Sequence, residues 1–180
     1  MPYKFVREPL TEEEADSLSA ACRTTQEKLV VWTLLDTALR VSELCALQAH
    51  NILWQQRAIR VVNGKGGPYG KMSSNIRTVP MSPRVQALIA PYFALNDRWF
   101  VGPRQVQRMV KDVANRARVS RKITPHVLRH TWATLTLQRG LSIAAVQKIL
   151  GHERLSTTAI YLNLTDKHVL DEYERVMARS

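Results

Sequence analysis

Two short segments in the C-terminal part of the sequence contain residue types that could act on a phosphate. The first, residues 124–134, reads TPHVLRHTWAT, and the second, residues 150–161, reads LGHERLSTTAIY. They contribute His126, Arg129, His152 and Tyr161. An arginine binds phosphate through a planar fork of N–H donors, an imidazole moves protons, and an activated tyrosine hydroxyl is a nucleophile. The combination predicts attack of Tyr161 on a DNA phosphodiester held by cationic and imidazole groups.

The first segment has the features of a helix start. Pro125 suits a first helical position, and His126 and Arg129, at i and i+3, then share one helix face. We expect both side chains to point outward together at the N-terminal turn, where backbone N–H groups also favour an anion. Leu128 and Trp132 are expected to point into the core.

His126 and His130 also have the i, i+4 spacing of metal ligands. The zinc-protease pattern requires Glu beside the first histidine, but Val127 occupies that position, and no cysteine or carboxylate cluster accompanies the pair. We therefore predict no metal site. His130 is interpreted as a residue that supports the site without touching the phosphate.

Other positions could supply a cation or a proton. Arg40 and Glu43 are spaced i and i+3, which fits a local ion pair or a second phosphate-binding arginine oriented by its carboxylate. Lys65 stands between glycines, where it is either a solvated turn residue or a flexible proton donor, and Lys71 competes for the second role. Tyr161 taken alone would be a buried aromatic residue with a hydrogen-bonded hydroxyl.

The pattern of apolar and turn residues predicts the elements that position these groups. Thr11 and the acids after it form a capping box for a helix that extends to about Cys22. Gly140 and Gly151 are expected to end two later helices. Further helices are predicted at 25–38, 83–94, 104–117, 126–138, 142–150 and 166–178, with a short one after Leu39 and strands at 52–54, 58–62 and 77–80. The fold class is mainly α with a small antiparallel β-sheet (α+β).

The positive charge is concentrated in the middle of the chain. The 180 residues carry a formal net charge of +11, yet the segment 57–129 alone has 15 Lys and Arg against Asp97 and Asp112. A polyanion is the partner that fits such an asymmetry, although charge alone does not distinguish DNA from RNA.

Length and composition limit the remaining possibilities. A chain of 180 residues is expected to form one domain with a real core. Apolar runs such as 29–35 are too short to span a bilayer, and residues 1–7 lack a signal-peptide pattern, so we expect a cytoplasmic protein without membrane association. Cys22 and Cys45 lack metal-like spacing and are expected to be reduced.

Taken together, four motifs resemble the catalytic domain of the tyrosine recombinase (phage integrase) family. They are the segment ALRVSEL at 38–44, GKG at 64–66, and the two segments described first. They follow one another in the order typical of the family and extend over most of the chain. The resemblance implies the tyrosine-recombinase catalytic-domain fold.

The resemblance also implies a role for each matching residue. Tyr161 would form a 3′-phosphotyrosyl link and release a 5′-hydroxyl, while Arg40 and Arg129 hold the scissile phosphate. Lys65 would protonate the leaving oxygen. His126 would assist proton transfer from the tyrosine, His152 would hydrogen-bond the phosphate, and Glu43 would support Arg40. We expect Lys71, Arg77 and Lys122 to contact DNA.

The family further implies partners and an assembly. Double-stranded DNA carrying a specific recombination site would be the substrate, with neither metal nor ATP required. A dimer or tetramer would form on the DNA, with accessory DNA-bending proteins, and the bound protein would be associated with the nucleoid.

The domain organisation is predicted as one catalytic domain over residues 1–180. About ten residues precede the first expected helix, so no N-terminal core-binding domain is evident. The helix at 166–178 would pack either on its own domain or on a neighbouring protomer.

Two rival functions stay open at the level of sequence. One is a DNA-binding module with little activity of its own. The other is a type IB topoisomerase-like enzyme, which the motif Gly151-His152 fits less well.

Overall fold

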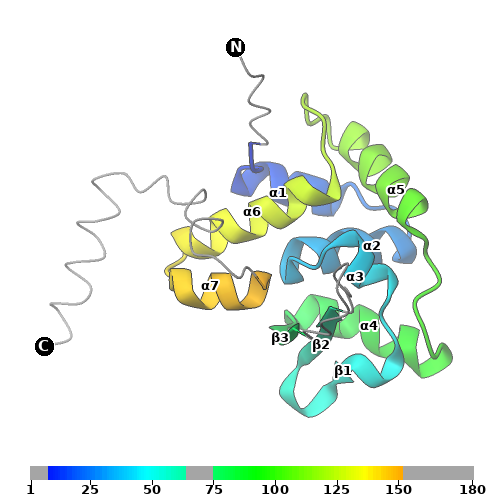
Figure 1. The fold of residues 1–180 in the computed structure, drawn as a ribbon. Helices are drawn as coiled ribbons and strands as arrows, with labels where there is room; N and C mark the ends of the chain where they lie inside the picture. The colour runs from blue at the N-terminus through cyan, green and yellow to red at the C-terminus, as the bar shows by residue number, and fades with distance from the viewer. Residues whose placement is uncertain (1–7, 64–74, 152–180) are drawn as a thin grey trace, which may run out of the picture.

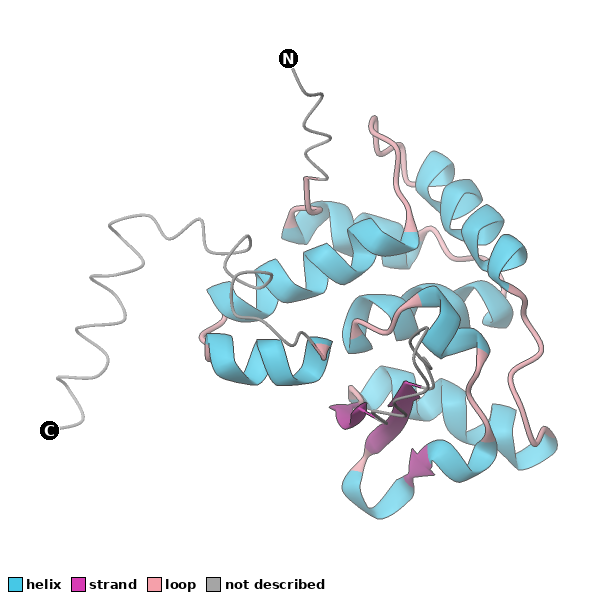
Figure 2. Ribbon diagram, in the orientation of Figure 1, coloured by secondary structure: helices cyan, strands magenta, loops and turns pink. Residues whose placement is uncertain are grey.

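The structure is a computed structural model, which describes residues 8–63 and 75–151. It is mostly helical with a small antiparallel sheet (Figures 1 and 2), as the sequence predicted. The α-helices are α1 (Glu12–Ala20), α2 (Thr25–Thr37), α3 (Val41–Cys45), α4 (Pro83–Leu95), α5 (Pro103–Arg116), α6 (Pro125–Gln138) and α7 (Ile143–Leu150). The strands are β1 (Ile52–Leu53), β2 (Ala58–Asn63) and β3 (Asn75–Pro80), and 3₁₀ turns cover Ala49–Asn51 and Trp54–Gln56.

Local capping signals set the beginnings of several helices. Thr11 and Glu14 form a capping box on α1, and Thr24 with Glu27 forms another on α2. The side chain of Thr124 accepts a hydrogen bond from the backbone N–H of Val127 at the start of α6. These boundaries agree with the predicted ones to within a residue or two, although α1 ends at Ala20 instead of near Cys22. The helix predicted at 166–178 lies outside the described residues.

The sheet is antiparallel in the order β1-β2-β3. The first strand is shorter than predicted, because Trp54 already belongs to a 3₁₀ turn. In β3 the side chains alternate, so that Arg77 and Val79 are buried whereas Ile76 and Thr78 are exposed. Arg77 therefore projects from the inner face of the sheet.

The main hydrophobic core surrounds α2. Val30, Val31 and Leu34 in this helix are completely buried, and α4, α5 and α6 all pack against it. A second apolar cluster joins the end of α2 to α6 and α7 through Ala38, Trp132, Ala133, Val146 and Leu150. This cluster fixes the C-terminal end of α7 next to the middle of α6 and the C-terminal end of α2.

Among the described residues, none of the helices is both long enough and apolar enough to cross a membrane. Cys22 is buried, and burial raises the pKa of its thiol to about 11. Cys45 is partly buried, and both cysteines are free thiols.

Candidate active site

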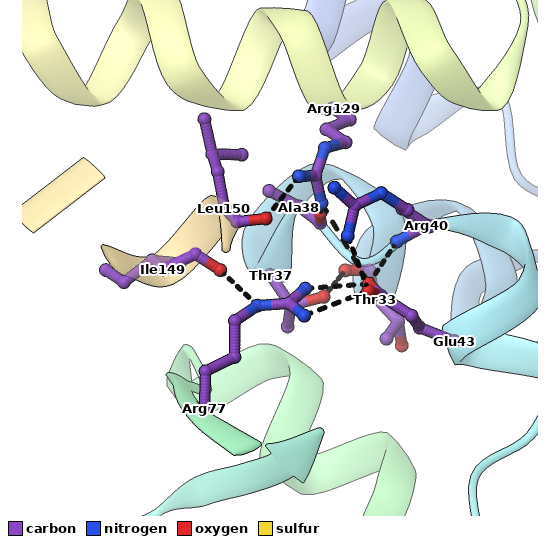
Figure 3. Close-up of polar contacts among 9 residues, drawn as sticks. All are labelled: Thr33, Thr37, Ala38, Arg40, Glu43, Arg77, Arg129, Ile149 and Leu150. Carbon is purple, nitrogen blue, oxygen red and sulfur yellow. Dashed lines mark hydrogen bonds and ion pairs between the residues drawn. The ribbon is translucent and has the colours of Figure 1, made fainter. Parts of the chain in front are cut away.

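A buried carboxylate, Glu43, lies at the centre of the candidate site (Figure 3). Glu43 belongs to the first turn of α3, and Arg40 is the residue that caps this helix. The carboxylate accepts one hydrogen bond from the backbone N–H of Arg40 at 2.8 Å and another from its Nη1 at 2.8 Å. The local ion pair is therefore present, and it fixes the direction of a side chain that remains 35% exposed.

Arg77 binds the same carboxylate from the opposite side. Its Nη1 lies 2.9 Å from Oε1 of Glu43 and its Nη2 lies 2.7 Å from Oε2, which is the parallel two-bond geometry favoured between guanidinium and carboxylate. Its Nε donates to the carbonyl of Ile149 at 2.6 Å. Arg77 was predicted from the sequence to contact DNA. In the structure its guanidinium is buried and paired with Glu43.

Arg129 reaches the cluster from α6. Its Nη1 donates to the carbonyl of Ala38 and lies 3.9 Å from Oε2 of Glu43, and its Nη2 donates to the carbonyl of Leu150 at 2.5 Å. The prediction that Arg129 points outward with His126 was wrong in this respect. His126 is exposed, whereas Arg129 is buried, because the ends of α2 and α7 cover its side of the helix.

The cluster of Arg40, Glu43, Arg77 and Arg129 contains three guanidinium groups and one carboxylate. Burial raises the pKa of Glu43, but hydrogen bonds and charges from Arg77 and Arg40 outweigh this effect and lower it to about 2. The carboxylate is thus ionised at neutral pH, and the four side chains together carry a net positive charge. Such a cluster is suited to binding an anion beside the partly exposed Arg40.

The histidines of α6 differ in their surroundings. His126 is exposed at the first turn of the helix, next to the helix N-terminus, where an anion is favoured. His130 is partly buried, and burial lowers its pKa. Within residues 8–63 and 75–151, no group of His, Cys, Asp and Glu side chains is arranged to hold a metal ion.

Several residues singled out in the sequence lie outside the described part of the chain. These are Lys65, Lys71, His152 and Tyr161. The described structure ends at Gly151, which closes α7 in the left-handed conformation with φ +66°. His152 is the residue that follows Gly151 in the sequence. Lys122, a predicted DNA contact, is exposed in the connection that precedes α6.

The internal role of Arg77 was not predicted from the sequence. The signal that could have revealed it is the alternation in β3, because Arg77 and the apolar Val79 are two residues apart and must occupy the same face of a strand. A basic residue on the inner face of a sheet requires a buried anionic partner. Glu43, which is 34 residues away in the sequence, supplies it.

The family model described as "Phage integrase family" matches residues 8–168. The tyrosine recombinase XerA of Pyrococcus furiosus is 35% identical, over 96% of this chain and 63% of its own length. A tyrosine recombinase of Thermosipho africanus is 34% identical, over 93% of this chain and 61% of its own length. The chain therefore spans less than two thirds of these curated relatives.

Solved structures show the same fold. The crystal structure of XerA recombinase superposes with a TM-score of 0.77 at 33% identity, covering 93% of this chain and 63% of that one. A Tn1549 transposon integrase in complex with circular intermediate DNA gives a TM-score of 0.74 at 22% identity, with 94% and 66% covered. At this lower identity the second match supports the fold alone. The motifs, the arginine cluster, the family model and the two relatives agree, and the chain belongs to the phage integrase family.

Proposed function

We propose that this chain is the catalytic part of a site-specific recombinase, which cleaves and rejoins DNA strands through a covalent link to Tyr161. The observation that carries the proposal is the convergence of Arg40 and Arg129, from separate elements, on one buried carboxylate. This arrangement supports a phosphate-binding role, since an excess of guanidinium charge stabilises the negative charge that develops in phosphoryl transfer.

The proposed reaction divides the work among the predicted residues. The partly exposed side chain of Arg40 contacts the scissile phosphate, and the buried guanidinium of Arg129 contributes positive charge from inside the protein. The hydroxyl oxygen of Tyr161 bonds to phosphorus while the bond to the 5′ oxygen breaks, which leaves a 3′-phosphotyrosyl link and a 5′-hydroxyl. Because a free phenol has a pKa near roughly 10, it requires help to lose its proton, and His126 provides this help.

The leaving oxygen requires a proton as it departs. We assign this role to Lys65, with Lys71 as the competing residue on the same segment, and we assign a hydrogen bond to the phosphate to His152. Rejoining is the reverse reaction, in which a 5′-hydroxyl attacks the phosphotyrosyl link. The link retains the energy of the original phosphodiester, so strand exchange requires no ATP.

Double-stranded DNA with a specific recombination site is the proposed substrate. The solved structures that share the fold include XerH site-specific recombinase bound to difH substrate and Tn1549 transposon integrase in complex with circular intermediate DNA. We infer that the chain acts as a dimer or tetramer on DNA, with accessory DNA-bending proteins, in the cytoplasm and on the nucleoid. The helix expected at 166–178 is a candidate for exchange between protomers.

Replacement of the nucleophile tests the proposal. With duplex fragments of host DNA, the wild-type chain should form an adduct that survives denaturation, and Tyr161→Phe should abolish the adduct while retaining DNA binding. Tyr92→Phe is a matched control, since it removes a tyrosine hydroxyl that joins α4 to residues 98 and 100. DNA binding without an adduct in the wild type would instead identify a binding module, and an adduct in Tyr161→Phe would refute the assignment.

A further inference from the structure

Arg77 connects parts of the site that are far apart in the sequence. Its guanidinium joins β3 to α3 through Glu43 and to α7 through the carbonyl of Ile149, across separations of 34 and 72 residues (Figure 3). The Arg77 side chain is only 6% exposed, and that of Glu43 is 5% exposed. Three hydrogen bonds from one buried guanidinium therefore hold these elements in a fixed relation.

The end of α7 is bound by two arginines in succession. Arg77 binds the carbonyl of Ile149, and Arg129 binds the carbonyl of Leu150. The last carbonyl groups of a helix lack partners within the helix, and cations near this end interact favourably with its dipole. A helix of eight residues has little stability of its own, so its last turn depends on such tertiary contacts.

Gly151 shows how closely the backbone approaches Arg77. A Cβ atom at this position would lie 3.0 Å from Cδ and 3.2 Å from Nε of Arg77. The positive φ of Gly151 also disfavours any other residue. The chain thus turns away from α7 directly over the Arg77 side chain, immediately before His152.

We propose that Arg77 is a positioning residue, which ties the carboxylate that orients Arg40 to the end of α7 that leads into His152 and Tyr161. The inference rests on the proposed function for its consequence in catalysis. Its guanidinium is hydrogen-bonded to the carboxylate of Glu43 and to the carbonyl of Ile149. Its effect is to hold Arg40, through Glu43, and the end of α7 in one geometry, because a displacement of 1 Å in a catalytic site can cost about 10²-fold in rate.

The test compares Arg77→Met and Arg77→Lys with Arg84→Met. Arg84 is the control, because it also forms two hydrogen bonds to one carboxylate, from its Nε and Nη2 to Asp36 at 2.7 and 2.6 Å, and these join α4 to α2. The rate of adduct formation at saturating protein and the Kd are measured with the host duplex that reacts best with the wild type. Arg77→Met should lose about 10²-fold in rate while its Kd stays close to that of the wild type.

The other variants separate positioning from general stability. Arg77→Lys keeps one positive charge but cannot reach both carboxylate oxygens and the carbonyl of Ile149. Its rate of adduct formation should therefore fall less than that of Arg77→Met. It should also fold if Arg77→Met does not. Arg84→Met should keep the wild-type rate. An unchanged rate in a folded Arg77 variant, or an equal loss in Arg84→Met, would overturn the inference.

Hydrogen exchange gives a readout that does not depend on activity. The backbone N–H of Gly151 donates to the carbonyl of Gln147 at 2.9 Å. It should exchange faster in Arg77→Lys than in the wild type or Arg84→Met, because the last turn of α7 opens more often. Unchanged exchange would contradict the inference even if the wild type formed no adduct. Absence of an adduct in the wild type, with faster exchange in Arg77→Lys, would refute the proposed function alone.

Discussion

At the scale of single residues, Glu43 is the group on which the site depends. It is bonded to Arg40 and Arg77 and lies 3.9 Å from Arg129. Without this carboxylate, buried guanidinium groups would repel one another and lose their partner. The pKa of Glu43 is low because its hydrogen bonds and ion pairs with Arg77 and Arg40 stabilise the ionised carboxylate.

This pKa predicts how stability depends on acidity. The folded value of about 2 lies below the ordinary value of 4.5, so the contribution of Glu43 is present above pH 4.5 and is lost as the pH falls towards 2. A depression of this size corresponds to roughly 3 kcal/mol of unfolding free energy. The free energy of unfolding, measured with denaturant, should be much larger for the wild type than for Glu43→Gln at neutral pH, and this difference should shrink in acid. A difference in unfolding free energy that does not depend on pH would contradict the lowered pKa of Glu43.

The sequence predicted the Arg40–Glu43 pair because the two residues are one helical turn apart, and this spacing alone brings them together. It did not predict the inward direction of Arg77 or the burial of Arg129. Their partners are the carboxylate of Glu43 and the carbonyls of residues 38, 149 and 150, which are distant in the sequence. Such contacts arise only when β3, α6 and α7 are packed together.

At the scale of elements, Arg77 and Arg129 hold the end of α7 to the described cluster, and His152 follows this end in the sequence. Helix boundaries were predictable because Thr11, Pro125 and Gly151 act within one turn of the backbone. The arrangement of the helices around α2 was not predictable, because the sequence pattern does not specify which helices pack against one another. Gly151 illustrates both cases, since it was predicted as a helix end but its contact with Arg77 was not.

Replacement of Gly151 tests this junction. Gly151→Ala forces a left-handed backbone on a residue with a Cβ, which costs about 1–2 kcal/mol, and places that atom against Arg77. Denaturant unfolding should show that the free energy of unfolding falls by at least this amount. Gly102→Ala is the control, because a Cβ atom at this position would meet nothing within 4 Å. Alanine is a poorer N-cap than glycine, but it also lowers the entropy of the unfolded chain, and these two effects on stability oppose each other. Equal effects at both glycines would refute the contact.

At the scale of the whole molecule, the charge distribution agrees with a nucleic-acid partner. The net charge is +11, and Lys122 is exposed a few residues before His126. Binding to DNA releases counterions in proportion to the phosphates that a protein neutralises. The affinity of the chain for duplex DNA should therefore fall steeply as salt rises.

Neutralisation of one lysine makes this expectation specific. Lys122→Gln should reduce the slope of log K against log salt by about 1, as for the loss of one phosphate contact. Lys28→Gln is the control, because Lys28 in α2 lies over the ring of Trp32, at 5.7 Å from its centroid. Slopes can be measured by fluorescence anisotropy with a labelled duplex. Equal slopes for the wild type and Lys122→Gln would remove Lys122 from the DNA-contacting surface.

The most direct test of the central claim is to identify the residue that carries DNA in the denatured adduct. The adduct is digested with protease and nuclease, and the modified peptide is sequenced by mass spectrometry. We predict one modified residue, Tyr161, joined to a 3′ phosphate, with a free 5′-hydroxyl on the released strand. Attachment through another residue, attachment to a 5′ phosphate, or the absence of any adduct would contradict the proposed mechanism.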